Sequence, residues 1–137
     1  MERRIDSEAE YEGLFQSFKA ELAAFAKLFF RARDPEALKR WYCEHLGVGC
    51  GDWGTWDQQA GTTVFSPFPA DTDYFPAERQ WMLNLRVVAL DQLLGNLCAA
   101  GIEVITKDEW NDPSVGRFAR IHDPEGNPIE LWEPPAA

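Results

Sequence analysis

The first 25 residues show the spacing of an amphipathic helix. Apolar residues recur three, four and seven positions apart from Tyr11 to Phe25, and Ser7 with Glu10 forms a capping-box pair before them. The sequence therefore predicts a helix over residues 6–25 with a single apolar stripe. The stripe would be buried on the chain's own domain, at a dimer interface or over a cleft, and the pattern leaves these alternatives open.

After this helix the pattern changes to a strand, a helix and further short strands. Residues 28–33 predict a strand, and Asp34 followed by Pro35 predicts a helix that ends at Gly47. Aromatic and β-branched residues over 52–68, interrupted by glycines, predict two or three short strands. The proline-rich, acidic stretch 67–79 predicts a loop.

The second half repeats this order of elements with different residues. Strands are predicted over 82–88, 102–105, 118–122 and 129–132, and a helix over 90–100 with Cys98 on its inward face. Residues 123–128 predict the turn between the last two strands, with Gly126 where a positive φ is needed. The order of predicted strands and helix is therefore repeated in the two halves, although they share few identical residues.

Composition is that of a globular protein of one domain. The chain has 137 residues, of which 45% are hydrophobic and 13% aromatic, so it is not a disordered protein. No apolar stretch approaches the roughly 20 residues of a membrane span, and the start lacks the apolar run of a signal peptide. The three cysteines have no CxxC spacing, which argues against a disulfide framework or a structural zinc site and favours a cytoplasmic location.

The charge of the chain narrows its partners. Lys and Arg total 13 against 23 Asp and Glu, which gives a net charge of −10. No basic block is present to neutralise phosphates, so neither nucleic acid nor an anionic membrane is an expected partner. The acidic surface serves solubility or attracts cationic small molecules.

Two segments resemble a known superfamily. Residues 29–35 with the helix that follows and Leu46-Gly47 resemble the opening module of the vicinal oxygen chelate superfamily. Residues 123–131, DPEGNPIEL, resemble its closing DPxGNxxEL hairpin, and the resemblance spans roughly residues 27–133. The superfamily includes glyoxalase I, extradiol dioxygenases, fosfomycin-resistance enzymes and bleomycin-resistance proteins.

The resemblance implies an α+β fold, in which two βαβββ modules form curved mixed sheets around a cleft. The chain would be a single domain over residues 1–137, with an additional N-terminal helix in 1–25, the first module in 26–70 and the second in 80–135. Many members of the superfamily are homodimers, so the resemblance also implies a homodimer.

The divalent-metal site that the superfamily implies is degenerate in this sequence. The resemblance places its three protein ligands at Lys27, Met82 and Glu130. A protonated ammonium has no lone pair for a metal, and a thioether is too soft for an oxygen-rich site, so only Glu130 fits. We therefore expect no metal cofactor. Lys27 either faces Glu130 as a buried ion pair or, if the register is one position off, points to solvent.

Strand alternation in register with these positions predicts the side chains that face the cleft. Glu130 is the candidate general base, and His122 and Arg120 are candidates for positioning an oxyanion. The candidate ligand-binding residues are Lys27, Phe29, Arg31, Met82, Asn84, Phe118 and Trp132. For Trp53, Trp56 and Trp132, core packing and ligand stacking are both open.

Two functions follow from the resemblance. One is an enzyme, a lyase or isomerase of glyoxalase type or a dioxygenase-like member, that uses Glu130. The other is a metal-free protein that sequesters a small, cationic drug, as bleomycin-resistance proteins do. The lost metal ligands, the six Trp residues and the negative charge favour the second. No nucleophile elbow, phosphate-binding glycine loop or HExxH helix indicates an unrelated chemistry.

Overall fold

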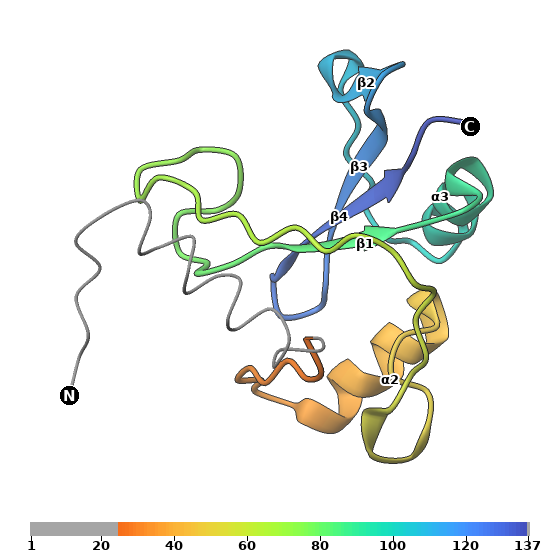
Figure 1. Ribbon diagram of the computed structural model, residues 1–137. Helices are drawn as coiled ribbons and strands as arrows, with labels where there is room; N and C mark the ends of the chain where they lie inside the picture. Colours follow the sequence, from red (N-terminus) through yellow and green to blue (C-terminus); the bar gives the residue numbers. More distant parts are fainter. Residues whose placement is uncertain (1–24, 137) are drawn as a thin grey trace, which may run out of the picture. The chain divides into compact units, whose positions relative to one another are not determined.

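The computed structural model describes residues 25–136, and the chain divides into two units, Met1–Arg31 and Ala32–Ala137. The helix predicted over 6–25 lies outside the described residues except at its last position. All helices and strands of the described part belong to the second unit (Figure 1). None of its helices is long and apolar enough to cross a membrane.

Helix α2 (Pro35–Leu46) begins and ends where the sequence predicts. The side chain of Asp34 accepts a hydrogen bond from the backbone N–H of Ala37, which caps the first turn. Gly47 adopts a left-handed conformation with φ 66° and ends the helix. Leu38 and Tyr42 lie one turn apart and are buried, so this face of α2 packs into the core.

The C-terminal half forms a four-stranded mixed sheet in the order β1-β4-β3-β2 (Figure 1). Its strands are β1 (Leu83–Arg86), β2 (Asn111–Asp112), β3 (Gly116–His122) and β4 (Pro128–Glu133). Strand β1 runs parallel to β4, whereas β3 is antiparallel to both β4 and β2. The turn between β3 and β4 has Gly126 at φ 85°, as predicted. The α+β class with a mixed sheet is confirmed.

The two faces of this sheet differ in character. Ala119, Ile121, Ile129 and Leu131 are fully buried on one face. Leu38 and Tyr42 of α2 and Leu90 and Leu97 of α3 (Leu90–Ala99) complete this core. The other face carries the residues that alternate with these along β3 and β4, among them Arg120, His122 and Glu130.

The strand predicted over 28–33 is wrong, because these residues make no strand pairing. The backbone N–H groups of Arg33 and Asp34 instead donate to the carboxylate of Glu125, at 2.6 and 3.1 Å. Phe29 is 85% exposed, so no neighbouring strand covers this segment.

The strands predicted over 52–68 are also wrong. Asp52–Gly54 forms a short 3-10 helix, η1, and the described backbone from 55 to 68 makes no strand pairing. The guanidinium of Arg86 contacts this segment and donates hydrogen bonds to the carbonyls of Gln59 and Ala60, at 3.4 and 3.1 Å. Trp53 is 99% exposed and Trp56 is exposed as well, so neither packs in the core.

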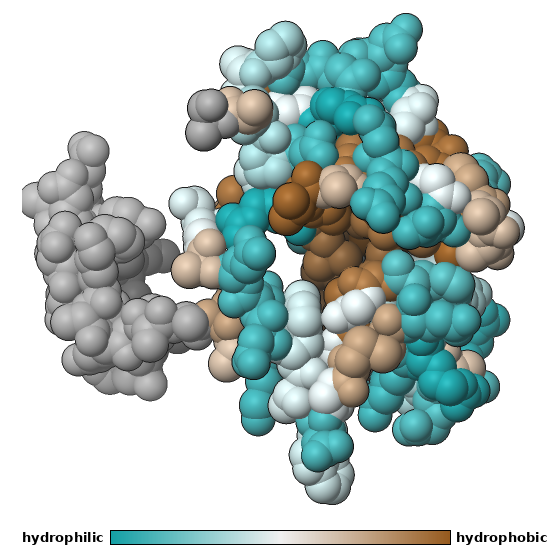
Figure 2. All heavy atoms as spheres, turned by 90° about the vertical axis from the view of Figure 1, so that its right-hand side faces the viewer, coloured by the Kyte–Doolittle hydropathy of each residue, from teal (hydrophilic) through white to brown (hydrophobic). Residues whose placement is uncertain are grey.

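Two further predictions in the second half need correction. Residues 102–105 form no strand, and only Ile105 makes an isolated bridge to Arg120. This segment is followed by a second 3-10 helix, η2 (Asp108–Trp110). Cys98 does not face inward on α3 but is exposed. On one face of the molecule, apolar residues gather in the middle and hydrophilic residues lie around them (Figure 2).

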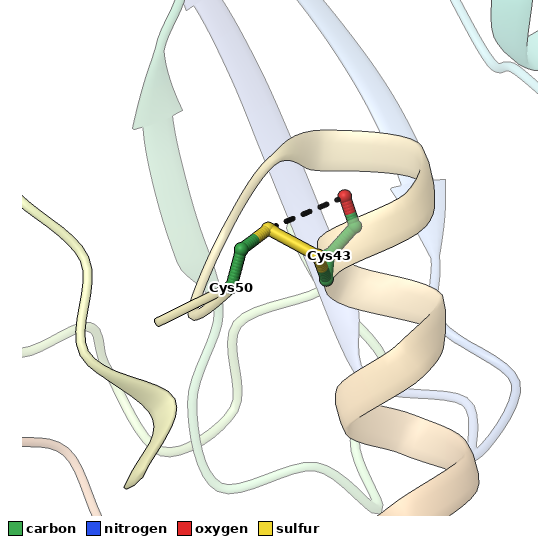
Figure 3. Close-up of a disulfide and its surroundings, with 2 residues drawn as sticks. All are labelled: Cys43 and Cys50. Carbon is green, nitrogen blue, oxygen red and sulfur yellow. Dashed lines mark hydrogen bonds between the residues drawn. A yellow bond between two sulfur atoms is a disulfide. The ribbon is translucent and has the colours of Figure 1, made fainter. Parts of the chain in front are cut away.

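A disulfide joins Cys43 to Cys50, contrary to the prediction from cysteine spacing (Figure 3). The left-handed turn at Gly47 brings the chain back after α2, so the two Cα atoms lie 5.1 Å apart. This separation lies within the usual range for bridged cysteines. Disulfides are rare in the cytosol, so this bridge does not favour the predicted cytoplasmic location. That location stays a prediction.

Candidate functional site

Three predicted site residues lie in one row across the sheet. Glu130 on β4 pairs with Asn84 on β1 and with Arg120 on β3. Directly paired residues on neighbouring strands point to the same face, so these side chains meet opposite the apolar core. Phe118 and Trp132 form the next pair on this face.

The carboxylate of Glu130 is the buried acid at the centre of this row, with the residue only 8% exposed. The amide of Asn84 donates to Oε1 at 2.7 Å, and the hydroxyl of Tyr74 donates to Oε2. A carboxylate has about four lone-pair positions, so each oxygen retains capacity for a further donor. Glu130 is therefore held in place by Asn84 and Tyr74, but the described residues do not saturate it.

Tyr74 reaches this carboxylate from the loop between residues 67 and 79. Burial and the hydrogen bond to Glu130 raise the pKa of the Tyr74 hydroxyl to about 12, against a smaller opposing effect of Arg120. Burial and the neighbouring carboxylate both favour the neutral phenol over the phenolate. Tyr74 thus stays protonated at neutral pH and acts as a hydrogen-bond donor.

Arg120 lies beside this pair and is 5% exposed. Its guanidinium carbon lies 5.0 Å from the centre of the Tyr74 ring and 5.5 Å from that of Trp110. These are cation–π contacts, in which the guanidinium lies over the two aromatic rings. Its Nε and Nη2 atoms are buried and have no hydrogen-bond partner within the described part of the chain.

Aromatic rings surround the polar row. Phe68 stacks on Tyr74 with ring centres 5.7 Å apart, and Trp110 meets the edge of Tyr74 at 6.3 Å. Phe118 and Trp132 stack at 6.2 Å, and the indole N–H of Trp132 donates to the carbonyl of Val115. The arrangement combines flat apolar surfaces with a few fixed polar groups, which is typical of small-molecule sites.

The remaining candidates lie outside the row of Asn84, Arg120 and Glu130, although His122 shares its face of β3. His122 is half-buried at the end of β3, opposite Pro128, and Met82 is half-buried directly before β1. Lys27, Phe29 and Arg31 belong to the first unit and are exposed. The pairing of Lys27 with Glu130, like the role of each candidate, stays a prediction.

Sequence reasoning missed Tyr74 and Trp110. Neither lies on a strand, so strand alternation could not place them. A usable signal was present, because the loop 67–79 carries three aromatic residues, Phe68, Tyr74 and Phe75, among prolines and acids. Large aromatic side chains in a loop need a surface to pack on, and the polar face of the sheet supplies it.

The model of the glyoxalase-like domain family matches residues 27–132. The chain therefore belongs to this family, and its recognition as a member of the vicinal oxygen chelate superfamily is confirmed. No curated protein sequence matches the chain.

Solved structures with the same fold include an antibiotic-binding protein, TnmS3, from Streptomyces sp. CB03234. It is 26% identical with a TM-score of 0.51, and the match covers 82% of this chain and 97% of that protein. A lactoylglutathione lyase from Agrobacterium tumefaciens is 19% identical with a TM-score of 0.54, covering 82% and 94% of the two chains. The likeness to the lyase concerns the fold alone.

The residues around Glu130 do not fit the divalent metal that the superfamily implies. Within residues 25–136, no three His, Cys, Asp or Glu side chains come together as a metal-binding group. The neighbours of Glu130 are an amide nitrogen and a protonated phenol, which donate to it, and a guanidinium, which carries N–H donors and no acceptor. A cation needs lone-pair donors, whereas this set of groups presents protons.

Proposed function

We propose that this protein binds a small organic molecule without a metal, at the polar face of the sheet around Glu130 and Arg120. The observation that carries the proposal is the incomplete hydrogen bonding of the buried Arg120 side chain. A buried guanidinium normally has its N–H groups paired, because an unpaired buried donor loses its hydration without compensation. Two N–H-bearing atoms of Arg120 lack partners within the described residues, so a ligand with acceptor atoms would complete the site.

Arg79 provides an internal comparison. Its Nε is also buried and unpaired among the described residues, but its Nη2 donates to the carbonyl of Glu125 at 2.8 Å. Arg79 therefore holds the turn between β3 and β4 and has a structural role. Arg120 has ring contacts but two nitrogen atoms that no described residue pairs, and it lies beside Glu130, which the same residues leave unsaturated.

The charges around the site suggest the kind of ligand. The sequence predicted a cationic ligand, but the positive charge of Arg120 lies close to Glu130 and opposes a second cation there. We favour an uncharged aromatic ligand that donates to Glu130 and accepts from Arg120. The rings of Trp110, Phe118 and Trp132 would supply stacking surfaces for it.

The similarity to TnmS3 supports binding rather than catalysis. That protein is described as an antibiotic-binding protein, and its fold and 26% identity extend over most of this chain. The alternative is a lyase or isomerase reaction of glyoxalase type, with Glu130 as general base. The likeness to the lactoylglutathione lyase, at 19% identity, concerns the fold alone, which makes this alternative the weaker proposal.

The test is a binding screen of the full-length protein after treatment with a chelator. A panel of neutral aromatic, cationic and dicarbonyl compounds would be examined by thermal shift, and each hit titrated by calorimetry. We expect a neutral aromatic hit whose affinity falls at least about tenfold in Glu130→Gln and in Arg120→Met, because each change removes a charge-assisted hydrogen bond.

Matched controls separate the site from general effects of charge. Glu103→Gln and Arg40→Met change exposed residues of the same types and should leave the affinity unchanged. Equal loss in the controls, or hits that need an added divalent metal, would overturn the proposal. Chemical conversion of a dicarbonyl compound that disappears in Glu130→Gln would establish the enzymatic alternative instead.

A further inference from the structure

We infer that the ligand contains a phenol-like ring and that Tyr74 occupies the place of this ring in the unliganded protein. The inference rests on the proposed binding site around Glu130 and Arg120. It adds the chemical class of the ligand and makes Tyr74 an internal competitor rather than a permanent wall of the site.

The contacts of Tyr74 are those of a bound phenol. Its hydroxyl donates to the buried carboxylate of Glu130, and its ring covers the guanidinium of Arg120 at 5.0 Å. Trp110 closes on the edge of the same ring. A free phenol placed here would form the same hydrogen bond and the same cation–π contact.

The segment that carries Tyr74 is suited to release it. Residues 67–79 form no helix or strand, and their local backbone hydrogen bonds are single turns, from Thr72 to Pro69 and from Arg79 to Pro76. The stacking partner of Tyr74 within this segment, Phe68, is itself exposed. Segments with few buried contacts open at lower free energy than the core, so this loop is the element expected to move.

Arg120 gives the reason why a ligand would displace Tyr74. The Tyr74 ring contacts the guanidinium but pairs neither Nε nor Nη2, which stay unpaired among the described residues. A phenol that also carries a carbonyl oxygen would make the contacts of Tyr74 and pair these N–H groups as well. The ligand class is therefore a neutral phenol with an additional acceptor oxygen.

The experiment compares small probes on the full-length protein. 4-Methylphenol reproduces the tyrosine side chain, toluene lacks its hydroxyl, and 3-acetylphenol adds a carbonyl that cannot bond to its own hydroxyl. Dissociation constants would be measured by NMR titration for the wild-type protein, Tyr74→Phe, Tyr74→Ala and Glu130→Gln. Tyr42→Phe serves as the matched control, because Tyr42 also donates to a buried carboxylate.

The inference predicts the order of affinities 3-acetylphenol, 4-methylphenol, toluene. Loss of the Tyr74 hydroxyl removes one competing hydrogen bond, so Tyr74→Phe should bind both phenols about two- to tenfold more tightly. Tyr74→Ala should show a larger gain, Tyr42→Phe no change, and Glu130→Gln a loss. If Tyr74→Ala does not fold, Tyr74→Phe still decides the outcome.

The possible failures are distinguishable. Unchanged or weaker phenol binding in Tyr74→Phe, with loss in Glu130→Gln, would overturn the competitor role and leave the binding site intact. Absence of phenol binding, while another compound binds in a manner that depends on Glu130, would overturn the ligand class. If no compound binds in a manner that depends on Glu130, both this inference and the proposed function are wrong.

Discussion

Two tyrosine–carboxylate pairs connect other parts of the chain to its last hairpin, and they differ in how completely their polar groups are paired. Tyr42 of α2 donates to Asp123 at 2.7 Å, and Tyr74 of the loop donates to Glu130. Both acids are buried. The contacts around them are very different.

Asp123 is saturated by protein donors. Besides the Tyr42 hydroxyl, it accepts the backbone N–H of Glu125 at 2.9 Å, the backbone N–H of Asn127 at 3.0 Å and the Asn127 side-chain amide at 2.8 Å. Burial and this carboxylate raise the pKa of Tyr42 far above its ordinary range. Such a closed network fixes the turn between β3 and β4 against α2, and it leaves no capacity for a ligand.

Glu130 accepts only two hydrogen bonds from described residues, and Arg120 beside it keeps two unpaired nitrogen atoms. The two pairs share their chemistry, so this difference points to a difference in role. Complete pairing is typical of a structural network, whereas a buried, incomplete network leaves groups for another molecule to satisfy.

The largest expected effect follows from removing the saturated acid. Asp123→Ala leaves the Tyr42 hydroxyl, two backbone N–H groups and an amide without their acceptor, so we expect a loss of about 3 kcal/mol or more in the free energy of unfolding. Denaturant unfolding measures it. Asp57→Ala, at an exposed position, should stay within about 0.5 kcal/mol of the wild type. A loss below about 1 kcal/mol in Asp123→Ala would show that the saturated network is not structural, and the contrast with Glu130 would be wrong.

The two hydroxyls provide the next test. Tyr42→Phe removes a hydrogen bond to a buried charged group and should cost about 1.5–3 kcal/mol in the free energy of unfolding. Tyr74 is half-buried on a loop, so Tyr74→Phe should cost less than about 1 kcal/mol. Equal costs in chemical unfolding would show that the Tyr74 hydrogen bond is as structural as that of Tyr42.

A titration sharpens the comparison. The pKa of Tyr74 is raised from 10.0 to about 12, so its contribution to stability is complete below pH 10 and is lost as the pH rises through 12. Phenolate absorbance of the wild type minus that of Tyr74→Phe should show a transition near pH 12. A transition near pH 10, the ordinary value, would mean that Tyr74 does not contact Glu130 in solution.

The smallest expected effect concerns metal. Chelation should leave the thermal midpoint of the wild type unchanged, because a ligand that does not bind the native state cannot stabilise it. Elemental analysis should accordingly find less than stoichiometric transition metal. One tightly bound metal per chain would show that the donors around Glu130 are arranged differently.

The sequence predicted the elements whose signals are local. Asp34, Pro35 and Gly47 bound α2 through capping chemistry, and the turn at Gly126 follows from its left-handed conformation. The row of Asn84, Arg120 and Glu130 followed from strand alternation once the closing hairpin was recognised. These features depend on neighbouring residues or on a periodic pattern.

The rest depended on contacts that sequence patterns do not encode. β-Propensity over 52–68 did not produce strands, and the carbonyls of Gln59 and Ala60 accept hydrogen bonds from the side chain of Arg86. The helix end at Gly47 was predicted, but the path of the chain after it, which brings Cys50 within 5.1 Å of Cys43 (Cα–Cα), was not. Tyr74 reaches Glu130 across 56 positions of sequence, so only the folded chain reveals the pair.

The most direct test of the central claim observes the guanidinium groups themselves. Arg120 and Arg79 both have a buried Nε–H that is unpaired among the described residues, and NMR can follow these two protons during titration with a ligand identified in the screen. The account predicts that the Nε–H signal of Arg120 moves downfield as it gains an acceptor, while that of Arg79 stays in place. A ligand that binds without moving the Arg120 signal, or that moves both signals equally, would contradict the claim that Glu130 and Arg120 form the binding site.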